Sequence, residues 1–369
     1  MELIESFNIL VGLRYAVLYL LLVITIYLLV VIVLLPRSYR LGIFSEFLLG
    51  INSAYRNSSL FHRLGRVLGD KKQPKGLPIL EPYEVVSVRC IRILGLNPGS
   101  HTLQGTNTYL IGTSSNKILI DTGEDITSKA YVSFLLDVVF KNTNTEQLSD
   151  ILLTHGHGDH QGGVSLLLKE FKRRNIPLPR IHKCNIVNGM YPCTAFKSEH
   201  IKDQQIFKCK GATLRAIHTP GHTDDHMSFM LLEDKAILSG DSVLGCGTTV
   251  FDNLKQYMDS LHHLKSIITK ESVSLIYPGH GPVIKDALGK VTDYIRHRQF
   301  REDEIVSILK TNDKRWYSSY ELVDLVYGKE NLSFFVKFSA QYNISHVLNK
   351  LKEENKVNYK TATGLYKFN

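Results

Sequence analysis

Residues 151–163 read ILLTHGHGDHQGG, a short apolar run that stops at a polar loop rich in glycine. Such a run predicts a buried strand that ends at the loop, and the apolar residues that resume at Val164 predict a helix that leaves it. The loop supplies three imidazoles and one carboxylate at the end of the strand: His155, His157, Asp159 and His160. Neutral imidazole and carboxylate are ligands that zinc accepts, so the loop could form a metal site. The alternative without function is a solvated turn that contains histidines by chance.

Three later apolar runs also end in residues of the ligand type. The segments that follow them are TPGHTDDH at 219–226, SGD at 239–241 and YPGHG at 277–281. They add His222, Asp241 and His280 to the candidate ligands. Four separate strand ends that carry such residues favour a built site over a solvated turn.

The order of these motifs resembles the metallo-β-lactamase superfamily, and within it the glyoxalase II-like group. The segments NPG at 97–99 and TLQGTNTYL at 102–110 add to the resemblance, which runs from about Val85 to the C-terminus and leaves the first eighty residues unexplained. It implies an α/β fold of the αββα sandwich type, with metals at one edge between the sheets. It also implies a winged-helix-like C-terminal domain.

The resemblance implies a site with two Zn²⁺ ions. His155, His157 and His222 would hold the first ion, Asp159, His160 and His280 the second, and Asp241 would bridge them. Two ions roughly 3.5–4 Å apart can activate water at neutral pH, so no Ser or Cys nucleophile is needed. We expect Asp159 to act also as the catalytic general base.

Other polar residues near the motifs have weaker indications. Asp121 ends the strand before the ligand loop, and we expect it to orient a ligand or the loop, with a turn-forming aspartate as the alternative. Asn107 and Arg298 are hypotheses for substrate contact, although a solvated helix face is the more ordinary interpretation of the pair His297 and Arg298. We interpret His218 and His226 as structural.

The net charge of +9 lies mainly outside the motif region. Residues 76–284 carry twenty Lys/Arg against twenty Asp/Glu, while residues 1–75 carry nine against four and residues 285–369 carry fifteen against eleven. A basic face over the catalytic region therefore cannot be claimed, and the charge pattern expected of a nucleic-acid-binding protein is only weakly met. The five cysteines show no CxxC spacing, which favours reduced thiols over a disulfide framework.

Residues 15–35 form an uncharged apolar run, which as a helix would match a bilayer core and predicts a transmembrane segment. The basic residues that follow it predict a single-pass membrane protein with the catalytic domain on the cytoplasmic side. A mitochondrial location is the alternative that the resemblance implies.

Four regions are predicted along the chain. They are a transmembrane anchor at 1–36, a basic juxtamembrane linker at 37–80, a metallo-β-lactamase domain at 81–286 and a winged-helix-like domain at 287–369. The last is expected from helices near 287–308, 320–326 and 339–352, followed by a short hairpin.

The expected function is that of a metal-dependent hydrolase. The resemblance implies an endoribonuclease that cleaves phosphodiester bonds of single-stranded RNA, the expected partner, with a water activated by the two ions. One alternative is a glyoxalase II-like thioester (hydroxyacylglutathione) hydrolase with the same ligands. A further alternative is a membrane-tethered binding protein that a metal stabilises.

Overall fold

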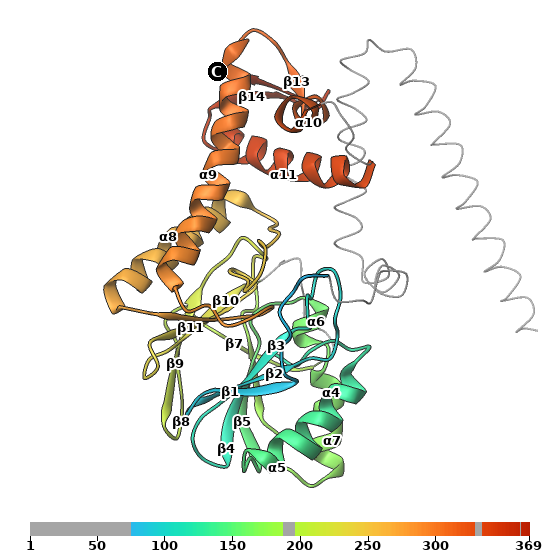
Figure 1. Cartoon of the computed structure of the whole chain (residues 1–369), viewed down its shortest axis with the longest axis vertical. Coiled ribbons are helices and arrows are strands. Elements are labelled where there is room, and N and C mark those ends of the chain that lie inside the picture. The colour runs from blue at the N-terminus through green and yellow to red at the C-terminus, as the bar shows by residue number, and fades with distance from the viewer. Residues whose placement is uncertain (1–74, 187–195, 329–333, 362) are drawn as a thin grey trace, which may run out of the picture. The chain divides into compact units, whose positions relative to one another are not determined.

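The computed structural model describes residues 75–186, 196–328, 334–361 and 363–369 (Figure 1). Contacts between residues divide the chain into two compact units: the sandwich unit, which ends at Arg301, and the C-terminal unit, which begins at Glu302. Helix α9 (Ala287–Thr311) runs through this division. The domain limit predicted from the sequence lies between residues 286 and 287, where this helix begins, and it stays a prediction.

The larger sheet of the sandwich unit has seven strands in the order of the chain. Strands β1 to β4 are antiparallel neighbours, whereas β4 to β7 are parallel. The strands are β1 (Tyr83–Ser87), β2 (Cys90–Leu94), β3 (Asn107–Ile111), β4 (Asn116–Ile120), β5 (Gln147–Leu152), β6 (Arg180–Lys183) and β7 (Glu199–His200).

The smaller sheet has five strands in the order β12-β11-β10-β9-β8. All neighbours are antiparallel except β11 and β12, which are parallel. The strands are β8 (Ile206–Cys209), β9 (Ala212–His218), β10 (Met227–Leu231), β11 (Ala236–Gly240) and β12 (Leu275–Pro278).

The two sheets pack face to face around a shared apolar core. In β4, Ile118 and Ile120 point into this core, while Leu119 between them points to the outer face, where it packs beneath helices. Every residue of β2, β3, β10 and β11 is buried, because both faces of these strands are covered. These strands therefore do not alternate between buried and exposed residues, and even polar members such as Arg92 and Thr108 are buried.

Helices cover the outer faces of both sheets (Figure 1). The larger sheet is covered by α4 (Ser128–Phe134), the π-helical segment η1 (Leu135–Val139), α5 (Phe140–Asn142) and α7 (Val164–Arg173), which share an apolar cluster with it. On the side of the smaller sheet, α8 (Leu254–Glu271) buries a stripe of residues that includes Tyr257, Leu261 and Leu264. The result is an αββα sandwich.

Two local features differ from the sequence analysis. The strand-favouring residues at 85–96 predict one strand from the sequence alone, but residues 83–94 form the hairpin of β1 and β2, which turns at Val88 and Arg89. Helix α8 was not expected at all, although Asn253 caps its first turn by accepting a hydrogen bond from the backbone N–H of Gln256. The four described cysteines, Cys90, Cys184, Cys209 and Cys246, form no disulfide.

The predicted transmembrane helix requires a correction. None of the helices found in the described ranges is long and apolar enough to cross a membrane. The long helices α9 and α11 (Phe334–Glu353) carry charged side chains along their length, and each such charge would cost about 3 kcal/mol at the centre of a bilayer. The predicted segment itself, residues 15–35, lies outside the described residues. The predictions of an anchor, of a single-pass topology with a cytoplasmic catalytic domain, and of a membrane-tethered binding protein therefore have no support in the described helices.

The C-terminal unit follows the order helix, short strand, two helices and hairpin, which is the order of a winged helix. After α9 come β13 (Tyr317–Ser318), α10 (Ser319–Tyr327), α11, β14 (Val357–Lys360) and β15 (Leu365–Phe368). The three strands form a sheet in the order β13-β15-β14. Helix α10 begins with a capping box, in which the Ser318 hydroxyl accepts from the Glu321 backbone N–H and the Glu321 carboxylate accepts from the Ser318 backbone N–H.

We expect Phe171→Ala to lower the free energy of unfolding of the sandwich unit by about 3–5 kcal/mol, because it removes a fully buried ring that packs edge-on against Phe140. Denaturant titration with a far-ultraviolet circular dichroism signal measures this change. Leu178→Ala is the control, since the Leu178 side chain is 49% exposed and should change stability by less than about 0.5 kcal/mol. An equal effect of both substitutions would contradict the placement of α7.

Candidate metal centre

The ligand loop leaves β5 and enters α6 (Gly158–Gln161), the short helix that precedes α7. His155 and His157 lie in the loop, and Asp159 and His160 lie in α6. Gly163 is needed where α7 begins, because a Cβ atom there would lie 2.1 Å from the backbone carbonyl oxygen of Thr122. The loop therefore packs directly on the backbone that follows β4.

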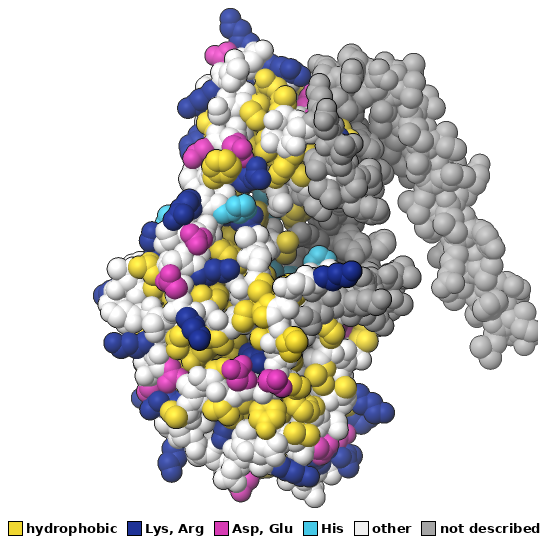
Figure 2. Space-filling view, viewed as in Figure 1, with side chains coloured by type: hydrophobic (Ala, Val, Ile, Leu, Met, Phe, Trp, Pro, Cys, Tyr) yellow, Lys and Arg dark blue, Asp and Glu magenta, His cyan; other side chains and the backbone are white. Residues whose placement is uncertain are grey.

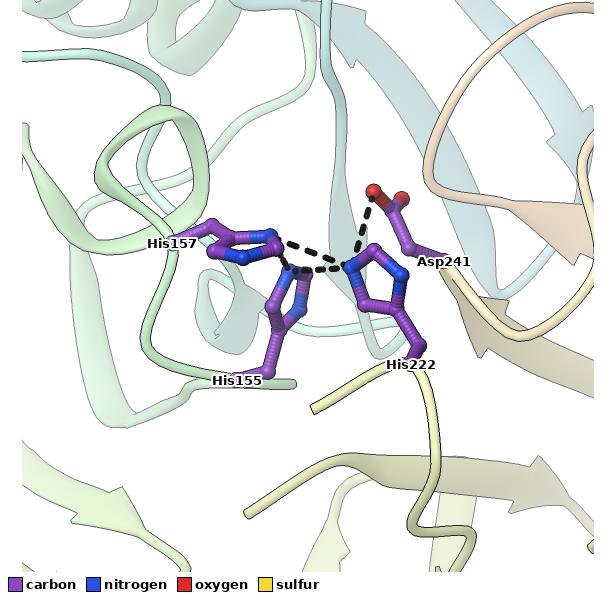
Figure 3. Close-up of side chains that lie close together, drawn as sticks. All are labelled: His155, His157, His222 and Asp241. Atoms are coloured by element: carbon purple, nitrogen blue, oxygen red, sulfur yellow. Dashed lines mark hydrogen bonds and ion pairs between the residues drawn. The ribbon is translucent and has the colours of Figure 1, made fainter. Parts of the chain in front are cut away.

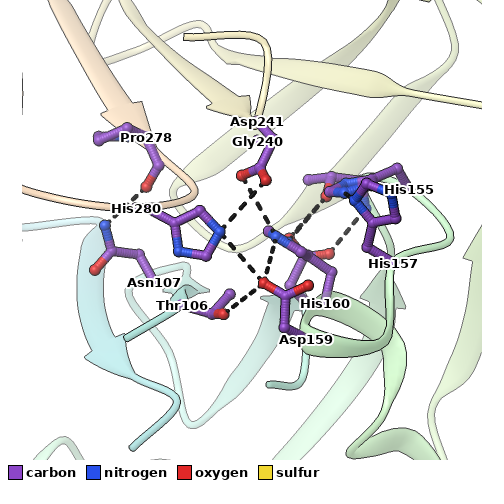
Figure 4. Close-up of polar contacts among 12 residues, drawn as sticks. Thr106, Asn107, His155, His157, Asp159, His160, Gly240, Asp241, Pro278 and His280 are labelled. Carbon is purple, nitrogen blue, oxygen red and sulfur yellow. Dashed lines mark hydrogen bonds and ion pairs between the residues drawn. The ribbon is translucent and has the colours of Figure 1, made fainter. Parts of the chain in front are cut away.

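The remaining candidate ligands come from the smaller sheet. His222 lies in the loop between β9 and β10, Asp241 follows β11, and His280 follows β12. All seven candidates meet at one edge of the sandwich, where they form two groups (Figures 3 and 4).

The first group consists of His155, His157, His222 and Asp241 (Figure 3). The Nε2 atom of His155 lies 2.9 Å from Nδ1 of His157 and 3.3 Å from Nε2 of His222. The last two atoms are 3.1 Å apart, and Oδ2 of Asp241 lies 3.6 Å from Nε2 of His222. Three ring nitrogens thus point at one another around a single point.

The second group consists of Asp159, His160 and His280, and Asp241 reaches it from the first group (Figure 4). Oδ2 of Asp159 lies 3.3 Å from Nε2 of His160 and 3.3 Å from Nε2 of His280. Asp241 presents Oδ1 to His160 at 3.4 Å and Oδ2 to His280 at 3.3 Å. The Asp241 carboxylate therefore faces both groups.

Burial and neighbouring charges set the protonation of these side chains. Burial, reinforced by the other imidazoles, lowers the pKa of His155 and of His157 well below the usual range, so both rings are neutral. Burial would raise the pKa of Asp159 and of Asp241, but the facing His160 and His280 hold both pKa values well below the usual range. A metal ion requires neutral imidazoles and ionised carboxylates. The facing carboxylates Asp159 and Asp241 outweigh burial and raise the pKa of His160 well above its usual range and that of His280 to about 10, so these two rings would release a proton when a metal binds.

The seven residues fit a pair of metal ions. Two donors that bind one tetrahedral zinc ion at about 2.0–2.1 Å lie roughly 3.3 Å apart, which is close to the separations in both groups. Among the described residues, the buried Nε2 of His160 and Oδ1 of Asp241 have no hydrogen-bond partner. A bound cation would satisfy both atoms, and imidazole with carboxylate is a zinc donor set.

Asp121, at the end of β4, holds the ligand loop from behind. Its carboxylate accepts from the backbone N–H of Thr154 at 2.8 Å and from the Thr154 hydroxyl at 2.8 Å, and it lies 2.7 Å from Nδ1 of His160. The Thr154 hydroxyl also lies 2.9 Å from Nδ1 of His155. One carboxylate thus orients two candidate ligands, one directly and the other through Thr154.

Arg298, on α9, lies behind the first group. Its guanidinium donates to the backbone carbonyl of Thr249 at 2.7 Å and lies 4.7 Å from the centre of the Phe251 ring. The carbonyl of Val250, between these two residues, lies 2.7 Å from Nδ1 of His222. These contacts favour a positioning role for Arg298, and its predicted contact with substrate stays a prediction. His297 is exposed on the same helix.

Asn107, at the start of β3, is 1% exposed. Its amide nitrogen donates to the backbone carbonyls of Pro278 and Gly281, each at 2.8 Å, on either side of His280 (Figure 4). Asn107 therefore fixes the loop that carries a candidate ligand. A direct contact of Asn107 with substrate stays a prediction that this burial does not favour.

Two further residues support the candidate ligands in ways that their motifs do not indicate. The Thr106 hydroxyl donates to Oδ2 of Asp159 at 3.0 Å (Figure 4). His226 is fully buried, and its Nε2 accepts from the backbone N–H of Asp241 at 3.0 Å. The motif TPGHTDDH contains His226, but spacing alone does not say which backbone group it would reach.

Comparison with known proteins identifies the family. The sequence profile described as "Metallo-beta-lactamase superfamily" matches residues 101–280. The Beta-lactamase-like protein 2 homolog of Caenorhabditis elegans is 41% identical over 273 residues, which cover 74% of this chain and 87% of that protein. The Atrochrysone carboxyl ACP thioesterase dmxR1 of Cryptosporiopsis sp. (strain 8999) is 36% identical, over 80% of this chain and 89% of that protein. The resemblance inferred from the motifs is confirmed.

Solved structures show the same fold. A Beta-lactamase domain protein from Burkholderia ambifaria matches with a TM-score of 0.65 at 15% identity, over 80% of this chain and 97% of that chain. At this identity the match supports the fold alone.

We expect Asp121→Ala to lower the affinity for zinc by about 10- to 100-fold, because His160 and the ligand loop lose the carboxylate that orients them. Titration calorimetry of the metal-free protein measures the affinity. Asp121→Asn keeps the size of the side chain, and its zinc affinity should lie between those of the parent protein and of Asp121→Ala. Asp137→Ala removes an exposed carboxylate from η1 and serves as the control. Unchanged zinc affinity in Asp121→Ala would show that Asp121 does not position the ligands.

Arg298→Ala tests the two roles considered for this residue. If Arg298 positions His222 through residues 249–251, zinc affinity should fall by roughly 10-fold. If it contacts substrate, KM should rise while zinc affinity stays the same. Arg296→Ala, two residues earlier on α9 and with a 74% exposed side chain, is the matched control and should change neither quantity.

Proposed function

The chain belongs to the metallo-beta-lactamase superfamily, and we propose that it is a hydrolase that works with two zinc ions and cleaves single-stranded RNA. One observation carries the proposal: seven buried or nearly buried imidazoles and carboxylates from four strand ends converge in two groups. His155, His157 and His222 would hold one ion, Asp159, His160 and His280 the other, and Asp241 would bridge them. Such ions supply an activated water and stabilise the charge that develops on the substrate.

Asp159 is suited to accept the proton of the attacking water. Its side chain is 18% exposed, compared with 10% for Asp241 and 2% for His280. The Thr106 hydroxyl donates to its Oδ2 atom and fixes the carboxylate. Of the three carboxylates at the site, Asp121 is buried behind the ligands and Asp241 lies between the two groups, so Asp159 has the most direct access to a substrate.

RNA is our first choice of substrate for two reasons. The motifs resemble the part of the superfamily that cleaves single-stranded RNA, and a relative at 41% identity is a Beta-lactamase-like protein 2 homolog. The C-terminal region also carries an excess of Lys and Arg, which suits a polyanionic strand.

A thioester is the second candidate substrate, and the comparisons give it a specific basis. Relatives at 36% and 35% identity are named Atrochrysone carboxyl ACP thioesterases. The same donor set can stabilise charge on a carbonyl oxygen as well as on a phosphoryl oxygen. The metal ligands alone therefore do not separate the two reactions, and the choice requires an assay.

We expect the zinc-loaded full-length protein to cleave an unstructured RNA and to leave lactoylglutathione and an acyl carrier protein thioester intact. Asp159→Ala and His160→Ala should each lower the rate at least about 100-fold, because each removes a metal ligand and one removes the proton acceptor. Asp259→Ala, which removes an exposed carboxylate from α8, is the control. Gel analysis of the RNA and thiol release from the thioesters measure the two activities.

The outcomes separate the candidates. Thioester hydrolysis with intact RNA would replace the first candidate with the second. Cleavage of RNA that survives both substitutions and a chelator would indicate a contaminating nuclease and contradict the proposal.

A further inference from the structure

We propose that the outer face of the small sheet in the C-terminal unit binds single-stranded RNA. This surface, the wing surface, consists of Trp316, Asn358, Lys360 and Lys367. The inference rests on the proposed ribonuclease function, because it supplies that function with a binding site for its substrate outside the metal centre.

Strand register places these residues on one face. Lys360 pairs with Leu365, which also pairs with Ser318, so all three positions face the same side of the sheet. Trp316 is two residues before Ser318, and Lys367 is two residues after Leu365. Asn358 pairs with Lys367 and completes the set. The opposite face packs inward, with Tyr317 and Tyr366 each less than 5% exposed. On the side of the wing surface Leu365 and Ser318 are also buried, so the accessible part of that side is limited to the four residues of the wing surface.

The wing surface combines an aromatic platform with positive charge. The Nζ atom of Lys360 lies 4.1 Å from the centre of the Trp316 ring, and that of Lys367 lies 5.7 Å from it. The indole is partly exposed, as is Lys367, and Lys360 is exposed. Within the described part of the chain, neither lysine pairs with a carboxylate. Both ammonium groups are therefore available to a ligand.

This arrangement fits a single nucleic-acid strand better than an acidic peptide. A base can stack on the indole, and the long lysine side chains can turn from the ring to the phosphates beside that base. An acidic peptide would use the lysines and leave the indole without a matching group. On the face shown in Figure 2, basic and acidic side chains are intermixed over the sandwich unit, and residues 76–284 carry equal numbers of both, so this face offers a polyanion no continuous basic track there.

The chain provides its own probe, because Trp316 is its only tryptophan. We expect titration of the full-length protein with an unstructured RNA oligonucleotide, in the presence of a chelator that prevents cleavage, to quench the tryptophan fluorescence to saturation. Anisotropy of a labelled oligonucleotide then gives the affinity of each variant. Trp316→Ala should bind roughly 5- to 150-fold more weakly, whereas Trp316→Phe keeps a ring for stacking and should recover most of that loss.

Lys360→Ala/Lys367→Ala should lower the slope of log affinity against log salt by about 1.4, since each contact with a phosphate of a single strand contributes about 0.7. Lys169→Ala/Lys208→Ala removes two exposed lysines from the sandwich unit and is the charge-matched control, which should bind as the parent does. Circular dichroism of each variant reports whether it folds.

Three results would overturn the inference: fluorescence that does not respond to RNA, equal weakening by both lysine pairs, or equally effective displacement by polyglutamate. The last would assign the surface to acidic proteins. Binding and cleavage are measured separately, so the two proposals fail separately. RNA that quenches Trp316 but is not cut by the zinc-loaded protein contradicts only the ribonuclease, and RNA that is cut without affecting Trp316 contradicts only the wing surface.

Discussion

The structure depends on a concentration of buried polar groups that could hold metal ions. Asp159 and Asp241 bring two carboxylates into a space where His160 and His280 face them and where burial opposes every charge. Removing one partner of such a buried set leaves an uncompensated charge, which is strongly destabilising. Because the seven residues come from strand ends in both sheets, their mutual attraction around bound ions would hold the two sheets together at this edge.

A second layer of contacts orients the candidate ligands at this edge. Asp121 adopts a left-handed backbone conformation, with φ of 59°, which is uncommon for a residue that has a side chain. Its carboxylate accepts from Thr154 twice and faces His160, so three contacts offset the backbone strain. Glycine would relieve the strain at this position but would leave His160 without its partner. An aspartate at this position therefore exchanges backbone strain for the orientation of His160, a candidate ligand.

The sequence could predict what is local to a motif. An apolar run followed by histidine, aspartate and glycine is a short-range signal, and the structure brings the seven candidate residues together, although their role as metal ligands stays a prediction. Helix α8 could also have been predicted from the sequence, because the capping residue Asn253 is followed by apolar residues at helical spacing: Leu254, Tyr257, Met258 and Leu261. The turn at Val88 was harder to predict, because the residues on both sides of it favour strands.

Contacts between distant segments could not be predicted in this way. Asn107 and Arg298 were considered for substrate contact because they are polar and lie near motifs, yet each donates to the backbone of a loop that carries a candidate ligand. Asn107 is 171 residues from Pro278 along the chain, and no pattern in either segment specifies that pairing. The prediction of a transmembrane helix failed for a different reason: it was made from the hydropathy and length of residues 15–35 alone, and none of the described helices could cross a membrane.

The candidate metal site does not by itself determine which substrate the protein binds. A pair of metal ions at this edge would be generic, because it would contribute charge and activated water to any substrate that reaches it. Residues 76–284, which contain the seven candidate ligands, carry as many acidic as basic residues, so their net charge does not favour a polyanion over a thioester. Selection must then come from side chains that contact the substrate away from the reacting bond. In the described part of the chain, the partly exposed indole of Trp316 with its two lysines has the chemistry that we propose for that selection, and it lies in the C-terminal unit, whereas all seven candidate ligands lie in the sandwich unit.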